Sequence, residues 1–161
     1  MATKRLFAEA AVQAANDAGC IFYSDPATLN EKYIDPLLRD AVSRINQSGW
    51  VWTAESCQGH PDFDGRTIKT AWEHNTRPML RLVCRIAHAG QMLASLALAA
   101  TYQFEDDADT GFSSARMTQG LELWPHTRRD GWFEVLAYFE AGNVAMRDIG
   151  CKRFEKFADL L

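Results

Sequence analysis

The spacing of apolar residues predicts helices near both ends of the chain and in its middle. Residues 7–19 are alanine-rich and amphipathic, and they form the first predicted helix. Asp35 is followed by proline, and this pair suits the N-cap and first position of a second helix. That helix ends at Gly49. A third helix is predicted over residues 86–102, and Asn143 is expected to cap the last one.

Short runs of β-branched and aromatic residues between these helices predict strands. The predicted strands cover residues 50–54, 79–84, 114–124 and 132–139, the last two joined as an antiparallel hairpin around residues 125–131. Helices that alternate with strand pairs favour an α/β domain of the α+β type. We therefore predict a mixed, largely antiparallel sheet of about four strands with helices packed mainly on one face.

Composition narrows the class of protein. The chain has 161 residues, 47% of them hydrophobic, which fits one domain over residues 1–161 with a proper core. Its net charge of -4 argues against a protein that grips nucleic-acid phosphates. Four widely spaced cysteines and a start without a signal peptide favour reduced thiols and a cytoplasmic protein. No apolar run is long enough for a bilayer, so no membrane partner is expected, while a homo-oligomer stays open.

The segment after the tryptophan-rich strand concentrates reactive side chains around one glycine. Ser56 offers a hydroxyl, Cys57 a thiol and His60 an imidazole, while Gly59 lets the chain turn sharply. Successive N–H groups in such a turn can also bind an anion. Two interpretations stay open from the residues alone. One is a ligand site, and the other is an ordinary glycine turn with a buried cysteine and a surface histidine.

Two kinds of chemistry are conceivable for this loop. Cys57 could be a nucleophile if His60 or His74 came within hydrogen-bond reach of its sulfur, although no third orienting group is evident. Cys57 and His60 could also begin a zinc site that His74 and Cys84 complete. Besides Cys57 and His60, the chain has no Cys-x-x-Cys or His-x-x-x-His pair that would supply two more ligands, so we expect no metal site.

Aromatic and basic residues near the loop suit a flat, anionic ligand. Trp52 and Trp72 could stack on a base, although tryptophan more often packs in a core. Arg81 and Arg85 lie in or just after an apolar strand, where each needs a carboxylate, a phosphate or solvent. The predicted ligand-binding residues are Trp52, Thr53, Ser56, Cys57, Gly59, His60, Trp72, His74, Arg81 and Arg85.

The pattern Thr53-x-x-Ser56-Cys57-x-Gly59, followed by the strand segment 78–85, resembles the tRNA wybutosine-synthesis methyltransferase family. That family carries a Ser-Ser-Cys-Ser-Gly-Arg loop, and the resemblance covers about residues 31–102. It implies a mixed α/β fold with a pocket beside the Ser-Cys-x-Gly turn, S-adenosylmethionine as cofactor and a tricyclic purine in tRNA as substrate.

Carried over to this chain, the family loop matches Ser56, Cys57 and Gly59, and His74 matches a histidine before the second strand. Two departures stand beside these matches. His60 takes the place of the family's arginine, and the family's Gly-Phe-Arg-x-Ser-Gly segment is not recognisable after the helix. The resemblance thus extends to scaffold and pocket more than to the methylation chemistry.

Our first functional hypothesis is a small-molecule binding protein that holds a nucleotide-like ligand beside the Ser56–His60 loop without any certain cofactor. One setting for such a protein is a phage, where it would sequester a nucleotide immune signal of the host. The first alternative is an S-adenosylmethionine-dependent methyltransferase acting on a modified purine nucleoside or RNA. The second is a Cys–His hydrolase that uses Cys57 and His60. The binding hypothesis is preferred because no complete catalytic set is evident in the sequence.

Overall fold

The computed structural model describes residues 13, 17, 34–60, 76–102, 120–127, 131–141 and 143–161. In chain order its elements are η3 (Pro36–Leu38), α2 (Arg39–Gln47), β1 (Val51–Cys57), β2 (Met79–Arg85), η5 (Ile86–His88), α3 (Ala89–Thr101), β3 (Leu121–Thr127), β4 (Trp132–Phe139) and α5 (Val144–Asp159). Of the predicted helix over residues 7–19, only Gln13 and Asp17 are described. Both are helical, and the Gln13 side chain donates to Asp17 Oδ1 at 2.8 Å.

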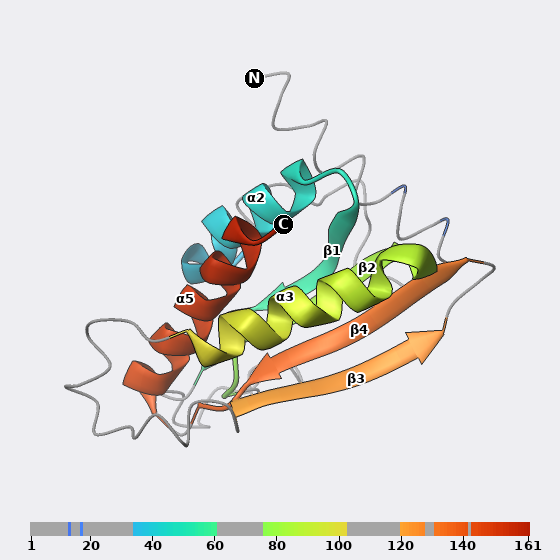
Figure 1. Ribbon diagram of the computed structural model, residues 1–161. Coiled ribbons are helices and arrows are strands. Elements are labelled where there is room, and N and C mark those ends of the chain that lie inside the picture. Colours follow the sequence, from blue (N-terminus) through green and yellow to red (C-terminus); the bar gives the residue numbers. More distant parts are fainter. Residues whose placement is uncertain are drawn as a thin grey trace, which may run out of the picture.

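The strands form one sheet in the order β1-β2-β4-β3, and each neighbouring pair is antiparallel. Helices α2, α3 and α5 lie together against one face of this sheet (Figure 1). The predicted α+β class, with a four-stranded, largely antiparallel sheet and helices on one face, is confirmed. In the described residues the pairing is antiparallel throughout rather than mixed.

Alternation along the strands divides the sheet into two faces. On β2, Leu80, Leu82 and Cys84 point toward the helices and are completely buried. The helices contribute large apolar side chains to the same core, and the Phe139 and Phe154 rings meet edge to face at 4.7 Å. We call this the helix face of the sheet, and the opposite one the outer face.

The helix starts follow the predicted signals only in part. Asn143 caps α5 as expected, because its Oδ1 accepts from the Met146 N–H at 2.9 Å. Asp35 does precede η3, but its carboxylate makes no capping hydrogen bond there. It accepts instead from the backbone N–H of Gln58 at 2.8 Å. Asp35 therefore occupies the predicted N-cap position with proline after it, but a neighbouring loop offers its carboxylate a different donor.

Strands β1 and β3 each extend three residues beyond their predicted ends, and β2 extends one. Strand β1 continues past Ala54 to Cys57, because its last residues keep pairing with β2. Strand β3 runs through Pro125 to Thr127, which were predicted to belong to a turn. Proline is tolerated there because β3 lies at the edge of the sheet, where one row of backbone groups has no neighbouring strand.

A bulge interrupts β1 in its middle. Thr53 pairs with Leu82, and Glu55 pairs with the next residue of β2, Arg81. Ala54 is therefore an extra residue on β1. An extra residue of this kind shifts the alternation of side chains by one position.

The bulge decides which side chains of β1 reach the outer face. Trp52 faces outward before the bulge, while Thr53 faces α2 and exchanges hydrogen bonds with Asn46 at 2.8 and 3.0 Å. Directly opposed residues in antiparallel strands share a face. Glu55 and Cys57 therefore turn outward after the bulge, and the residue between them turns to the helix face.

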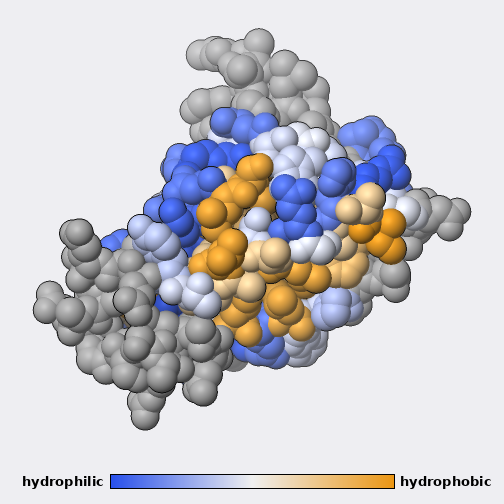
Figure 2. Space-filling view, in the orientation of Figure 1, coloured by the Kyte–Doolittle hydropathy of each residue, from blue (hydrophilic) through white to orange (hydrophobic). Residues whose placement is uncertain are grey.

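The outward side of the helix layer is partly apolar. Figure 2 shows apolar residues gathered over α3. Its outward positions include Ala94, Ala97 and Leu98, and the Leu98 side chain is 60% exposed. Among the described residues, the structure has no helix that is both long and apolar enough to cross a membrane.

Candidate functional site

The loop after β1 makes a tight turn at Gly59. This residue has a φ of +83°, in the left-handed region that favours glycine. A Cβ atom at this position would lie 2.6 Å from the carbonyl oxygen of Thr76 and 2.8 Å from the carbonyl carbon of Arg77. Both the backbone conformation and the close approach of another backbone segment therefore require glycine at this position.

Contacts from two other parts of the chain hold this loop in place. The N–H of Gln58 donates to Asp35, and its carbonyl accepts a hydrogen bond from the Cys151 thiol at 3.7 Å. The Gly59 carbonyl accepts from Arg147 Nη1 at 3.3 Å. Helix α5 and the segment before η3 thus fix the loop relative to the sheet.

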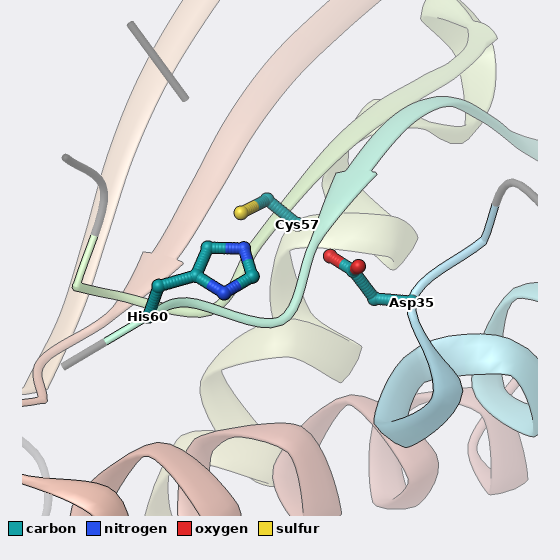
Figure 3. A group of neighbouring side chains, drawn as sticks. All are labelled: Asp35, Cys57 and His60. Carbon is teal, nitrogen blue, oxygen red and sulfur yellow. The ribbon is translucent and has the colours of Figure 1, made fainter. Parts of the chain in front are cut away.

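Three ligating side chains converge at the start of this loop. Asp35, Cys57 and His60 each offer one atom, and the three atoms lie within 4.8 Å of one another. Figure 3 shows the three groups pointing toward one another. The carboxylate comes from the segment before η3, the sulfur from the end of β1 and the imidazole from the loop that follows β1. Cys57 is buried, and the other two are half-buried.

The arrangement can be compared with a nucleophilic triad. In a Cys–His–Asp relay the imidazole stands between its partners and uses one ring nitrogen for each. In this loop one nitrogen of His60 lies within 4.8 Å of both the Cys57 sulfur and an Asp35 oxygen. One atom from each group thus lies near a common point, as the ligands of a bound cation do.

A buried ion-pair network crosses the middle of the outer face. Arg81 is buried, with Nε 3.1 Å from Glu134 Oε1 and Nη1 3.6 Å from Glu55 Oε2. Glu134 is completely buried. Burial raises the pKa of Glu55, Arg81 opposes that rise, and Glu134 adds to it. Arg81, predicted to contact a ligand, thus neutralises carboxylates within the protein.

Aromatic rings and arginines lie on both sides of that network. At one end the Trp52 and Trp132 rings are 5.9 Å apart, and the exposed Arg85 guanidinium lies 4.1 Å from the Trp132 ring centre. We call these three residues the Trp132 cluster. Two of them, Trp52 and Arg85, were predicted to bind ligand, and the structure brings them together.

The second group lies nearer the Cys57 loop. The Trp124 and Tyr138 rings are 6.3 Å apart, and the Arg77 guanidinium lies 4.5 Å from the Tyr138 ring centre. Trp124 is 51% exposed. Burial raises the pKa of Tyr138, Arg77 opposes this, and Cys57 is among the groups that add to it. We call Trp124, Tyr138 and Arg77 the Tyr138 cluster, and its phenol lies within electrostatic range of the Cys57 thiol.

The structure divides the predicted site residues between the two faces. Cys57, Gly59 and His60 lie together in and beside the loop. Thr53 faces α2, and Ser56 pairs with a core residue of β2, so both project to the helix face. The Ser56 hydroxyl therefore does not join the Cys57 thiol and the His60 imidazole.

The remaining predicted residues take no part in the described cluster. Trp72 and His74 lie outside the described residues. Cys84, which was considered as a zinc ligand, lies at the far end of β2 from the Cys57 pairing and is buried against the helices. Burial raises the pKa of its thiol to about 11.

Sequence reasoning missed Asp35, Trp124, Tyr138 and Trp132. Asp35 comes from an earlier element, and its place before proline pointed to capping. A usable signal for the outer face was Glu134, a lone acidic residue inside an apolar strand. Residues two and four positions away along a strand share its face. Trp132, two positions before Glu134, and Tyr138, four positions after it, therefore lie on the same face.

Comparisons of the chain with protein-family models, with curated proteins and with solved structures each found no match. The resemblance to the wybutosine-synthesis methyltransferases therefore stays a prediction that depends on the short motifs around Ser56, Cys57 and Gly59.

Proposed function

We propose that this protein binds a nucleotide-like small molecule along the outer face of its sheet. The observation that carries the proposal is the pair of ring-and-arginine clusters around Trp132 and Tyr138, one on either side of the Arg81–Glu134 ion pair. Trp132 itself is buried, so the rings open to a ligand are Trp124, Trp52 and Tyr138. Indole and phenol rings stack on bases, and guanidinium groups pair with phosphate oxygens. A nucleotide combines both of these groups.

The position of the Tyr138 cluster also connects this face with the loop singled out in the sequence. Cys57, Met79 and Tyr138 form one row across β1, β2 and β4. A ligand on the Tyr138 ring would therefore lie next to the Cys57 loop. This continuity supports a single binding region rather than two unrelated ones.

The proposed role is retention of the ligand without reaction. Around the two clusters, the described polar residues are largely engaged with one another. Arg77 pairs with Glu122, whose other oxygen accepts from the Trp124 indole at 2.5 Å, and Arg81 pairs with Glu134. In a phage, a protein of this kind would sequester a nucleotide signal on which a host's immune response depends.

Isothermal titration calorimetry tests the proposal. The panel contains mononucleotides, cyclic mononucleotides, cyclic dinucleotides and S-adenosylmethionine, each titrated with a metal chelator present. We expect micromolar binding of at least one nucleotide and a loss of about tenfold in the Arg85→Gln variant, because one cation–π and phosphate contact is removed. Lys152→Gln is the matched control, since it removes one positive charge from the exposed side of α5.

Each other outcome has a defined meaning. If no member of the panel binds more tightly than millimolar, the proposal is wrong. Saturable binding of S-adenosylmethionine alone would favour the methyltransferase alternative. Chromatography of the ligand after incubation separates binding from catalysis. Recovery of unchanged ligand supports retention, whereas a product that disappears in Cys57→Ser would favour the Cys–His hydrolase.

A further inference from the structure

We propose that Asp35, Cys57 and His60 form a binding site for a zinc-class divalent cation. The inference goes beyond nucleotide binding and does not depend on it. It begins from the three ligating atoms, one from each residue, that lie within 4.8 Å of one another where the loop leaves β1.

The spacing of the three atoms is close to that of a metal centre. Zinc takes thiolate, imidazole and carboxylate ligands at bond lengths of roughly 2.0–2.3 Å in a tetrahedral arrangement, which places the ligand atoms about 3.5 Å apart. The observed limit of 4.8 Å exceeds this by roughly the amount that small side-chain rotations supply. Side-chain rotation is therefore the adjustment that we expect when the cation binds.

The types of ligand decide which cations fit. A thiolate and an imidazole suit Zn²⁺ and chemically similar ions, whereas Mg²⁺ and Ca²⁺ prefer sites made entirely of oxygen. When the cation binds, the Cys57 thiol gives its proton to water and a sulfur lone pair forms the bond to the metal. The negative charges of Cys57 and Asp35 then balance the two positive charges of the ion.

The surrounding contacts keep two of the ligands in position. The Gln58 N–H donates to Asp35 Oδ2 at 2.8 Å, a contact that orients the carboxylate as outer partners do in metal sites. The turn before His60 is held at Gly59, both by Arg147 and by the close approach of the Thr76 backbone. Three protein ligands on a fixed frame leave a fourth position for water or for a ligand oxygen, as in catalytic zinc sites.

Cobalt spectroscopy tests this site. Metal-free protein in a reducing, metal-free buffer is titrated with Co²⁺ alone, and absorbance is followed from the near ultraviolet to the visible. We expect one equivalent to produce a thiolate-to-cobalt charge-transfer band together with tetrahedral visible bands, and Zn²⁺ to displace both. Absence of the charge-transfer band at saturating Co²⁺ in folded protein would show that no such site exists.

Variants assign the band to the proposed ligands. Cys57→Ser should remove the charge-transfer band, and Asp35→Asn should weaken Co²⁺ binding by about 100-fold or more while keeping an oxygen that can accept from Gln58. Cys84→Ala is the matched control, because this thiol is buried in the core, away from the loop. Thermal unfolding of each metal-free variant shows that it folds. A band that persists in Cys57→Ser, or that disappears in Cys84→Ala, would place the cation elsewhere.

Discussion

The two faces of the sheet are both buried to a large extent, but by different means. On β2, Leu80 and Leu82 point to the helices, and the residue between them, Arg81, points to the outer face beside the fully buried Glu134. Apolar burial stabilises the folded state by roughly 25 cal/mol per Å² of apolar surface. Removing an arginine and a glutamate from water instead has a cost that their attraction offsets only in part.

The comparison indicates that stability alone does not explain the outer face. A pair of apolar side chains in place of Arg81 and Glu134 would fill the same space without the desolvation cost. The polar network and the two ring-and-arginine clusters beside it are the features on which the binding proposal depends. Variants that separate stability from binding test this difference between the faces.

The largest expected effect comes from removing one member of the buried pair. Arg81→Met removes the arginine whose Nε lies 3.1 Å from the completely buried Glu134 carboxylate. We expect the free energy of unfolding to fall by about 3–5 kcal/mol, measured by urea denaturation. Arg77→Met, which breaks a half-exposed pair with Glu122, is the comparison and should have a much smaller effect, because solvent screens that pair.

The double variant Arg81→Met/Glu134→Met sharpens the same point. With both charges removed, much of the lost stability should return, because the completely buried Glu134 charge is gone and only the partly buried Glu55 loses Arg81. Nucleotide binding should still be impaired, since the network lies between the two clusters. A double variant that is as unstable as the single one would instead assign the network a structural role.

An intermediate effect is expected at the loop on the outer face. Gly59→Ala combines a left-handed backbone with a collision against the Thr76 backbone, so it should cost about 2 kcal/mol or more. Gly49→Ala is a matched control with a φ of +77° and no atom within 4 Å of the added Cβ, and it should cost only about 1 kcal/mol. Thermal unfolding measures both. Equal losses would show that the close approach at Gly59 adds nothing.

The smallest expected effect concerns the pH dependence of stability. The pKa of Glu55 is raised from 4.5, chiefly by burial, so the folded state holds this proton more tightly than the unfolded state. The protonated carboxyl therefore favours folding at low pH, and this contribution disappears as the pH rises from 4.5 through the folded-state pKa. Glu55→Gln should flatten that part of the stability–pH profile in denaturation measurements. A profile that Glu55→Gln leaves unchanged would contradict the raised pKa.

The sequence was sufficient to predict the types and order of the described elements. Apolar periodicity predicted α2, α3, the hairpin and α5, and proline and asparagine marked helix starts correctly. The end of β1 was missed because Glu55, Ser56 and Cys57 are polar or small, so the run of aromatic and β-branched residues stops before them. Only pairing with β2 reveals that they extend the sheet, and such long-range pairing has no local signal.

Two of the three residues of the candidate site could be predicted from the sequence. Cys57 and His60 stand three positions apart, so their proximity follows from local geometry. Asp35 reaches them through tertiary packing, and although it occupies the N-cap position before proline, its carboxylate bonds the loop instead of the helix start. The Ser56 hydroxyl was expected beside Cys57, but β1 continues through both residues, and adjacent side chains of a strand point to opposite faces.

The extra residue Ala54 and the bulge that accommodates it belong together. In a plain strand that kept this alanine, a serine would turn outward and Cys57 would turn into the apolar interior. Deletion of the alanine would instead remove the bulge and leave the thiol outward, because every later residue keeps its partner on β2. When distant relatives of this protein are aligned, a one-position gap at this point is therefore compatible with the same outward thiol.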